Sequence, residues 1–249
     1  MKFNFLYLVV FFLITSCSPT RNLAYFSDLK EQTSYTEEIT NLSVSKIQPN
    51  DLLSITVSSE SPESDMQFNR GMLGATENKL EGYLVDENGL IDFPVIGSVK
   101  VGGLTKQEAK DALSSALQQY LKEPVVSIRN MNFKVTVIGE VNRPSTFTVP
   151  AEKISVLEAL GMAGDMTPFG KRENVIVMRE ESGTRTMVRL NLNQKDVLSS
   201  PYFYLQQNDV VYVEPDKMKQ VQASTNTRTL SIVTSLTTLA IVIVSYLLR

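Results

Sequence analysis

Histidine and tryptophan are absent from this chain of 249 residues, and cysteine occurs only once. Without histidine the chain cannot form a Ser-His-Asp or Cys-His catalytic arrangement, and one thiol alone forms neither a zinc site nor an intrachain disulfide. The net charge of -3 argues against nucleic acid as a partner, because phosphate binding needs a concentrated basic face and none is visible. Only chemistry carried by carboxylates stays open, and we expect no catalytic residue, metal or cofactor.

The first of two long apolar runs lies at the N-terminus and ends just before the single cysteine. Residues 5–14 are apolar, a lysine precedes them, and the small residue Ser16 lies directly before Cys17. A run this short is typical of a secretory signal rather than of a transmembrane helix. We therefore expect 1–16 to be a signal peptide. Cys17 is then either the residue at which the chain is processed or an incidental cysteine near the cleavage site. The polar residues 17–43 are expected to form a tether, with a short helix near 23–30.

The second apolar run, residues 230–248, contains no charged residue and is long enough to cross a bilayer as a helix. We expect a transmembrane helix there, because a single span in lipid must satisfy its own backbone hydrogen bonds. Hydroxyl residues recur along the run at helical spacing and gather on one stripe at about 100° per residue. The stripe consists of Ser231, Thr234, Ser235, Thr238 and Ser245.

Two interpretations of this hydroxyl stripe stay open. Serine and threonine hydroxyls in membrane helices commonly bond to carbonyl groups of their own helix or hold neighbouring helices together. Alternatively, the stripe faces water inside a ring of identical helices, and its five members then line a pore.

Between the two apolar runs, the pattern predicts two folded units that are rich in strands. The first unit covers 44–131. Its residues 52–57 alternate between apolar and polar side chains, as in a strand with one buried face, and Asn88-Gly89 predicts a tight hairpin turn. Thr105 and Glu108 form a capping box, which predicts that a helix begins there.

The second unit covers 132–216 and begins with an alternating strand at 133–139. Ser155 and Glu158 form another capping box and predict a short helix. The following residues 217–229 are polar, and we expect them to link this unit to the C-terminal helix.

Two sets of oxygen-bearing side chains are candidates for metal binding or catalysis. Asp86, Glu87 and Asn88 carry oxygen atoms of the kind that calcium binds, but the spacing lacks the further donors of an EF-type loop, so we interpret them as a turn. Asp86 and Glu140 are carboxylates that an enzyme acting on glycans would need. Both fall in predicted turns or at strand ends, and we assign neither a catalytic role.

The order of these features resembles the outer-membrane polysaccharide export lipoproteins, the Wza-type exporters. The segment IQPNDLLSI is similar to the opening of the family's export domain, and VDENG followed by FPVIG is similar to its hairpin. The resemblance implies an α+β fold in which a β-rich polysaccharide export domain precedes one soluble-ligand-binding β-grasp (SLBB) domain and one C-terminal transmembrane helix. The matching segments are 47–55, 85–97, 103–126 and 133–213.

The signal region carries a resemblance of its own, and the second unit departs from the family pattern. Residues 14–17 resemble the bacterial lipobox, which implies that Cys17 is lipidated, and Ser18 after it implies sorting to the outer membrane. Pro144 is followed by serine where glycine is usual, and Gly164 by aspartate, so these turns are expected to differ locally. The best-known members have two β-grasp domains, whereas this chain has room for one.

The resemblance implies a function without chemistry. We expect an outer-membrane lipoprotein, with its bulk in the periplasm, whose copies form a ring with a porin-like channel for exporting capsular or exopolysaccharide. Family members with a terminal helix are octamers, and their inner-membrane partner is a polysaccharide co-polymerase, in some cases a tyrosine autokinase. The alternative is a periplasmic glycan-binding or scaffold lipoprotein whose C-terminal helix is only an anchor.

Overall fold

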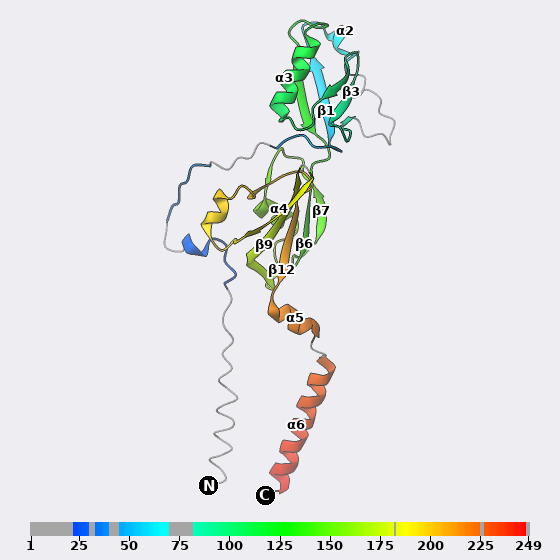
Figure 1. The fold of residues 1–249 in the computed structure, drawn as a ribbon. Coiled ribbons are helices and arrows are strands. Elements are labelled where there is room, and N and C mark those ends of the chain that lie inside the picture. The colour runs from blue at the N-terminus through cyan, green and yellow to red at the C-terminus, as the bar shows by residue number, and fades with distance from the viewer. Residues whose placement is uncertain are drawn as a thin grey trace.

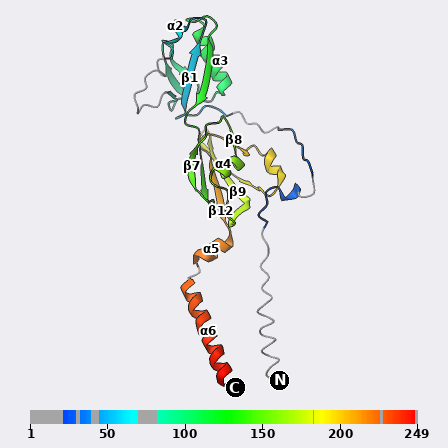
Figure 2. The ribbon, with the colours of Figure 1, turned by 180° about the vertical axis from the view of Figure 1, so that it is seen from behind.

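The computed structural model describes residues 22–29, 33–39, 45–69, 82–181, 183–224 and 227–247. The predicted signal peptide and Cys17 lie outside these residues. Figures 1 and 2 show two β-rich units joined end to end, with two helices leading away from the second unit on the side opposite the first. The α+β prediction is confirmed for the described part of the chain.

The first unit is built on a three-stranded antiparallel sheet in the order β2-β1-β5. Buried and exposed residues alternate along most of the central strand β1, as its sequence predicts, because one face packs on the core of the unit. A hairpin, β3 with β4, and two helices complete the unit. Its elements are β1 (Leu52–Ser58), α2 (Pro62–Asp65), β2 (Tyr83–Leu84), β3 (Leu90–Phe93), β4 (Gly97–Lys100), α3 (Lys106–Leu117) and β5 (Val125–Asn130).

Helix α3 begins at the predicted capping box. The hydroxyl of Thr105 accepts the backbone N–H of Glu108 at 3.2 Å, and the carboxylate of Glu108 accepts the N–H of Thr105 at 2.8 Å. Two backbone donors that a helix start leaves unpaired are thereby satisfied. Ala109, Leu113 and Leu117 form the buried face of α3 and pack into the core of the first unit.

The second unit contains a five-stranded mixed sheet in the order β10-β9-β12-β6-β7. Its first strand, β6, and its last, β12, lie parallel at the centre, with Val137 opposite Val211. Antiparallel strands flank this pair on both sides, and the result is the strand order of a β-grasp sheet. The elements are β6 (Lys134–Gly139), β7 (Ser145–Thr148), β8 (Ile154–Ser155), α4 (Val156–Met162), β9 (Gly170–Glu181), β10 (Thr184–Leu190), the 3-10 helix η3 (Lys195–Ser199), β11 (Tyr204–Leu205) and β12 (Val210–Pro215).

A buried ion pair ties β9 to the turn before β12. The guanidinium of Arg179 donates to the carboxylate of Asp209 at 2.7 Å, and Asp209 has no exposed surface. Arg179 also donates to the carbonyl of Tyr204 at 3.1 Å and lies 4.8 Å from the centre of the Tyr202 ring. These partners replace the water molecules that both charged groups lose on burial. The ion pair therefore holds the turn before β12 against β9.

Part of the predicted tether is bound to the second unit. We call residues 25–28 the strap. The backbone N–H groups of Phe26 and Ser27 donate to the carbonyls of Leu192 and Asn193 at 3.1 and 2.7 Å. The short helix expected here is a single 3-10 turn, η1 (Ser27–Leu29).

The side chain of Tyr25 holds the strap in place. Its hydroxyl donates to the carboxylate of Asp165, and the guanidinium of Arg172 lies 5.4 Å from the centre of its ring. Tyr25 also packs against the core of the second unit. Burial, followed by the hydrogen bond to Asp165, raises the pKa of the Tyr25 phenol above its ordinary value, so the phenol keeps its proton.

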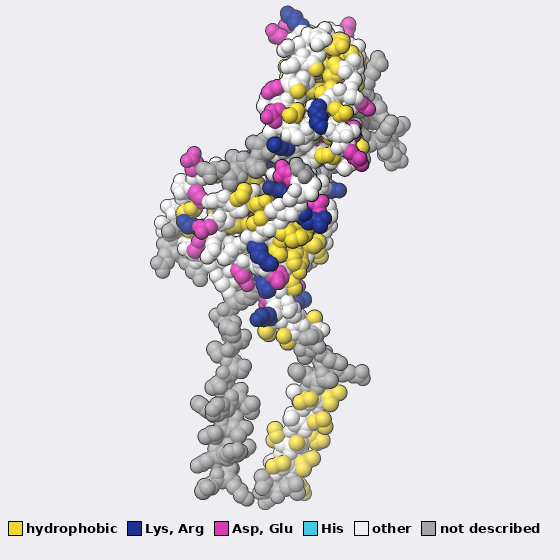
Figure 3. All heavy atoms as spheres, viewed as in Figure 1, with side chains coloured by type: hydrophobic (Ala, Val, Ile, Leu, Met, Phe, Trp, Pro, Cys, Tyr) yellow, Lys and Arg dark blue, Asp and Glu magenta, His cyan; other side chains and the backbone are white. Residues whose placement is uncertain are grey.

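Two helices follow β12. The segment expected to link the second unit to the C-terminal helix, 217–229, contains helix α5 (Lys217–Ser224), which begins where the carboxylate of Asp216 accepts the N–H of Lys219 at 2.8 Å. Helix α6 (Thr227–Leu247) forms as predicted, and Figure 3 shows apolar side chains exposed along it. Among the helices of the described residues, none is long and apolar enough to cross a membrane, so the predicted transmembrane helix is not found.

Candidate functional site

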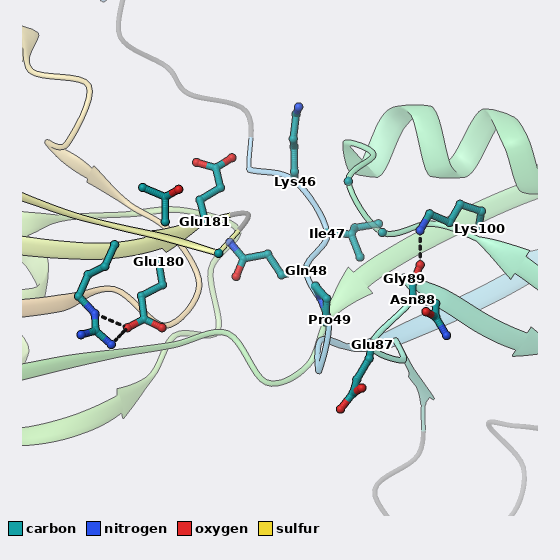
Figure 4. Close-up of a pocket in the computed structure, with 15 residues that line it drawn as sticks. Lys46, Ile47, Gln48, Pro49, Glu87, Asn88, Gly89, Lys100, Glu180 and Glu181 are labelled. Atoms are coloured by element: carbon teal, nitrogen blue, oxygen red, sulfur yellow. Dashed lines mark hydrogen bonds and ion pairs between the residues drawn. The ribbon is translucent and has the colours of Figure 1, made fainter.

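A cleft of about 750 Å³ lies where the two units meet (Figure 4), and we call it the junction cleft. The first unit contributes the turn 46–49, the hairpin turn 87–89 and the segment after β4, which holds Gly102 and Gly103. The second unit contributes the hairpin between β9 and β10. The cleft is therefore formed by turns from distant parts of the sequence.

The turn 46–49 is shaped by a buried carboxylate. Asp51 is 2% exposed, and its carboxylate accepts the N–H of Gln48 at 2.9 Å, while its own N–H donates to the carbonyl of Gln48 at 3.1 Å. Burial raises the pKa of Asp51. This closed turn leaves the Gln48 side chain free to extend toward the hairpin of the second unit, as Figure 4 shows.

The hairpin turn 87–89 forms as Asn88-Gly89 predicts. The carboxylate of Asp86 accepts the N–H of Leu90 at 2.7 Å, so Asp86 belongs to the turn. Gly89 has a φ of +76°, and a Cβ added to it would lie 2.9 Å from the Cα of Gly102. The backbones at Gly89 and Gly102 therefore approach so closely that a side chain at position 89 would clash.

The wall from the second unit carries both signs of charge. Arg185 donates to the carboxylate of Glu180 at 2.6 Å, which braces the hairpin. Glu181 and Thr184 follow on the same hairpin and line the cleft. Among the described lining residues of the whole cleft, three are cationic and three are acidic, so the cleft has no net charge. The cationic residues are Lys46, Lys100 and Arg185, and the acidic residues are Glu87, Glu180 and Glu181.

A hydrogen-bonded joint holds the two walls of the cleft in register. The side-chain amide of Asn132 donates to the carbonyl of Asn50 and accepts the N–H of Leu52, both at 2.9 Å. On the other side, Gln207 donates to the carbonyl of Asn132 at 3.0 Å and accepts the N–H of Lys134 at 2.8 Å. The sequence alone does not predict this joint, because an isolated Asn and an isolated Gln carry no local signal.

The hydroxyl stripe lies along α6, where the described side chains are exposed. The hydroxyls of Ser235 and Thr238 donate to the carbonyls of Ser231 and Thr234 at 2.8 Å, and Thr234 donates to Ser231 at 3.0 Å. These protons are thus used within the helix, whereas each hydroxyl oxygen keeps lone pairs for an outside donor. Ser245, the last predicted member, is exposed in the last turn of α6.

The two carboxylates weighed for catalysis do not come together. Asp86 lies in the first unit, whereas Glu140 lies in the second and accepts the hydroxyl of Thr167 at 2.7 Å. Glu140 also pairs with Lys219 of α5 at 3.4 Å, which fixes the start of α5 against the sheet. Both acidic residues have structural partners.

Comparison with known families identifies the two units. Residues 41–130 match the family model described as polysaccharide biosynthesis/export protein, and residues 133–213 match the SLBB domain model. The chain therefore contains a polysaccharide biosynthesis/export domain followed by an SLBB domain. The first unit is accordingly called the export domain below, and the second the SLBB domain. This family is a transport component without enzymatic activity, which confirms the prediction that the chain is not an enzyme.

Two curated relatives carry the same description. The chain is 28% identical over 144 residues to the EPS I polysaccharide export outer membrane protein EpsA of Ralstonia solanacearum. It is 28% identical over 139 residues to the protein of that name from Ralstonia nicotianae. The matched parts are 56% and 54% of this chain but only 38% and 36% of the two relatives, so the chain spans less than two fifths of their length.

Proposed function

We propose that this protein is a subunit of an oligomeric channel that carries capsular or exopolysaccharide from the periplasm across the outer membrane. The observation that carries the proposal is the union, in one chain, of an export domain, an SLBB domain and a helix whose apolar side chains are exposed. The outer-membrane location of the two relatives supports the proposed location.

The proposal gives α6 a place as one of several identical helices in a ring. A helix that crosses lipid only as a member of a ring needs apolar side chains on its outward face alone, and its inward face can be polar. Ile232, Leu236 and Ile243 are exposed at 52, 60 and 50% and lie away from the stripe. The inward face is the hydroxyl stripe, whose uncharged oxygens can bond water and sugar without holding a polymer tightly.

The SLBB domain offers a further surface for contact between copies. On the face of the sheet opposite α4, Ile138 and Met187 are exposed at 41 and 58%, and apolar side chains also gather over this domain in Figure 3. Exposed apolar groups of this kind favour association with another protein surface. In our proposal this face contributes to the ring.

The remaining parts of the proposal concern attachment and partners. Cys17 carries the acyl chains that hold the chain to the outer membrane, because two or more chains give lasting attachment where one does not. The export and SLBB domains stand in the periplasm, and an inner-membrane polysaccharide co-polymerase, with or without a tyrosine autokinase, supplies the polymer.

The test replaces the stripe at its centre. In Thr234→Leu/Thr238→Leu the helix is kept but the hydroxyls are lost, and we expect surface polysaccharide to fall toward the level of a strain without the gene. Two controls separate hydroxyl loss from a general defect. Thr234→Ser/Thr238→Ser keeps both hydroxyls and is expected to export normally. Thr237→Leu removes a hydroxyl that bonds to Val233 at 3.0 Å but lies outside the stripe, and it is also expected to export normally.

A second candidate function is favoured by the junction cleft. A cleft lined by polar groups suits a periplasmic glycan-binding or scaffold lipoprotein in which α6 serves only as an anchor. Normal export by Thr234→Leu/Thr238→Leu, together with a single-copy particle in mild detergent, would support this second function and reject the channel.

A further inference from the structure

We propose that the junction cleft binds a short stretch of uncharged, hydroxyl-rich saccharide. This inference rests on the proposed function, since it assigns a contact point on the chain to the exported polymer. It goes beyond that function, because a channel lined by α6 needs no saccharide site between the export and SLBB domains.

The size of the cleft fits such a ligand. Its volume of about 750 Å³ falls in the range of roughly 300–1,000 Å³ that small-molecule sites occupy. Turns form both walls, so the ligand can enter from solvent. A continuing polymer needs a site of this open kind, whereas a closed pocket would admit only its terminus.

The polar groups of the cleft match hydroxyls. Among the described residues, the side chains of Gln48, Glu181 and Thr184 have no hydrogen-bond partner, and all three line the cleft. An amide, a carboxylate and a hydroxyl offer donors and acceptors at once, and a sugar hydroxyl can pair with each of them. The three cationic and three acidic lining residues balance, so no net field attracts an acidic or a basic polymer.

Glycines open the backbone of the cleft to a ligand. Gly103 and Gly183 line it, and a Cβ added to either would meet no atom within 4 Å. Both have positive φ angles, +83° and +76°, which other residues adopt only with strain. The space beside these two glycines is therefore kept free by the backbone conformation itself.

The site is largely preformed. The Asn132 joint fixes the two domains, the Glu180–Arg185 pair braces one wall, and Lys100 donates to the carbonyl of Asn88 in the other. A preformed site loses less conformational entropy when a ligand binds. None of the described lining residues is aromatic, so they offer no stacking to a flat ligand face, and we expect a dissociation constant in the millimolar range. Weak binding suits a polymer in transit.

The experiment measures saccharide binding by saturation-transfer NMR on the full chain in mild detergent. Maltoheptaose serves as the neutral probe, oligogalacturonate as the acidic probe and chitosan oligosaccharide as the basic probe. We expect binding of maltoheptaose above both charged probes. Gln48→Ala/Glu181→Ala removes two contacts and should weaken maltoheptaose binding about tenfold. Gln119→Ala/Glu63→Ala removes the same two residue types at exposed positions outside the cleft and should leave binding unchanged.

A variant in the Asn132 joint tests whether binding depends on how the two walls of the cleft are held together. Asn132→Gly leaves every lining residue in place but removes both side-chain hydrogen bonds of the joint. We expect this variant to bind maltoheptaose more weakly, whereas each of its two domains should unfold at the same temperature as in the wild type. Equal binding by wild type and Gln48→Ala/Glu181→Ala overturns the inference, and so does tighter binding of either charged probe.

The failure of this inference can be told from the failure of the proposed function. If Gln48→Ala/Glu181→Ala binds maltoheptaose like the wild type while Thr234→Leu/Thr238→Leu stops export, the cleft is wrong and the channel stands. If the cleft variant loses binding while the leucine variant exports normally, the cleft stands and the channel is wrong.

Discussion

The two β-rich domains and the C-terminal helix treat their large apolar side chains in opposite ways. Each domain encloses a core of its own, as Leu113 in the export domain and Val177 in the SLBB domain show with no exposed surface. In α6, by contrast, Ile241 is 70% exposed and Leu236 is 60% exposed. A domain with a closed core is stable alone, whereas an apolar helix needs lipid or other copies to cover it. In the proposed channel, stability and assembly therefore depend on different parts of the chain.

Removing α6 should separate these two properties most completely. We expect a chain that ends after Ser224 to lose assembly and export entirely, because the long helix α6 with its exposed apolar side chains is gone. Its domains should unfold at the temperature of the full chain, since the described residues of α6 add nothing to either core. Particle mass in mild detergent and thermal unfolding by circular dichroism measure the two effects. A truncated chain that still assembles would move assembly to the SLBB sheet face.

A substitution in a domain core should have the reverse effect. Asp209→Ala leaves the buried guanidinium of Arg179 without a carboxylate partner, and we expect the SLBB domain to lose about 3–5 kcal/mol of unfolding free energy. Glu180→Ala removes an exposed pair, with 60 and 62% of the two side chains accessible, and should cost at most about 1 kcal/mol.

Urea unfolding of the two variants, each in the chain that ends after Ser224, gives the comparison without interference from detergent. An equal loss of unfolding free energy in the two variants would mean that water reaches Asp209 and Arg179 in the folded state. That result would remove the sharp distinction between a self-sufficient core and a partner-dependent helix.

The features that the sequence predicted are those encoded within a few residues. Both capping boxes, the Asn88-Gly89 turn and the alternating strands depend on neighbours along the chain, and all of them form. The hydroxyl stripe likewise follows from helical spacing alone. Helix α5 has a local signal that the sequence prediction does not use. Asp216 is a good N-cap residue, and the segment after it contains neither glycine nor proline.

The features that the sequence could not predict depend on contacts between distant residues. The Tyr25–Asp165 hydrogen bond closes a separation of 140 residues, and the Asn132–Asn50 bond closes one of 82. Nothing in the local pattern of a polar tether distinguishes a bound segment from a free one. The junction cleft was invisible for the same reason, since its walls meet only after both domains have folded and the joint has formed.

The strap is intermediate between the domains, which have closed cores, and helix α6, whose apolar side chains are exposed. It is held by few contacts and has no core of its own. Tyr25→Phe removes the hydrogen bond to Asp165 but keeps the ring under Arg172. We expect the amides of Phe26 and Ser27 to exchange hydrogen about fivefold faster, as the loss of roughly 1 kcal/mol predicts. Tyr120→Phe, at a half-exposed ring in the export domain, is the matched control and should leave these amides unchanged.

The same contact makes strap binding depend on pH. The ordinary pKa of a tyrosine is 10.0, and burial and the Asp165 carboxylate raise the pKa of Tyr25 above it. A released strap therefore loses the phenol proton at a lower pH than a bound strap does. Binding is fully retained below the ordinary value and weakens as pH rises from there toward the raised pKa. The difference in phenolate absorbance between wild type and Tyr25→Phe isolates this group, and a midpoint at the ordinary value would show that the strap is free in solution.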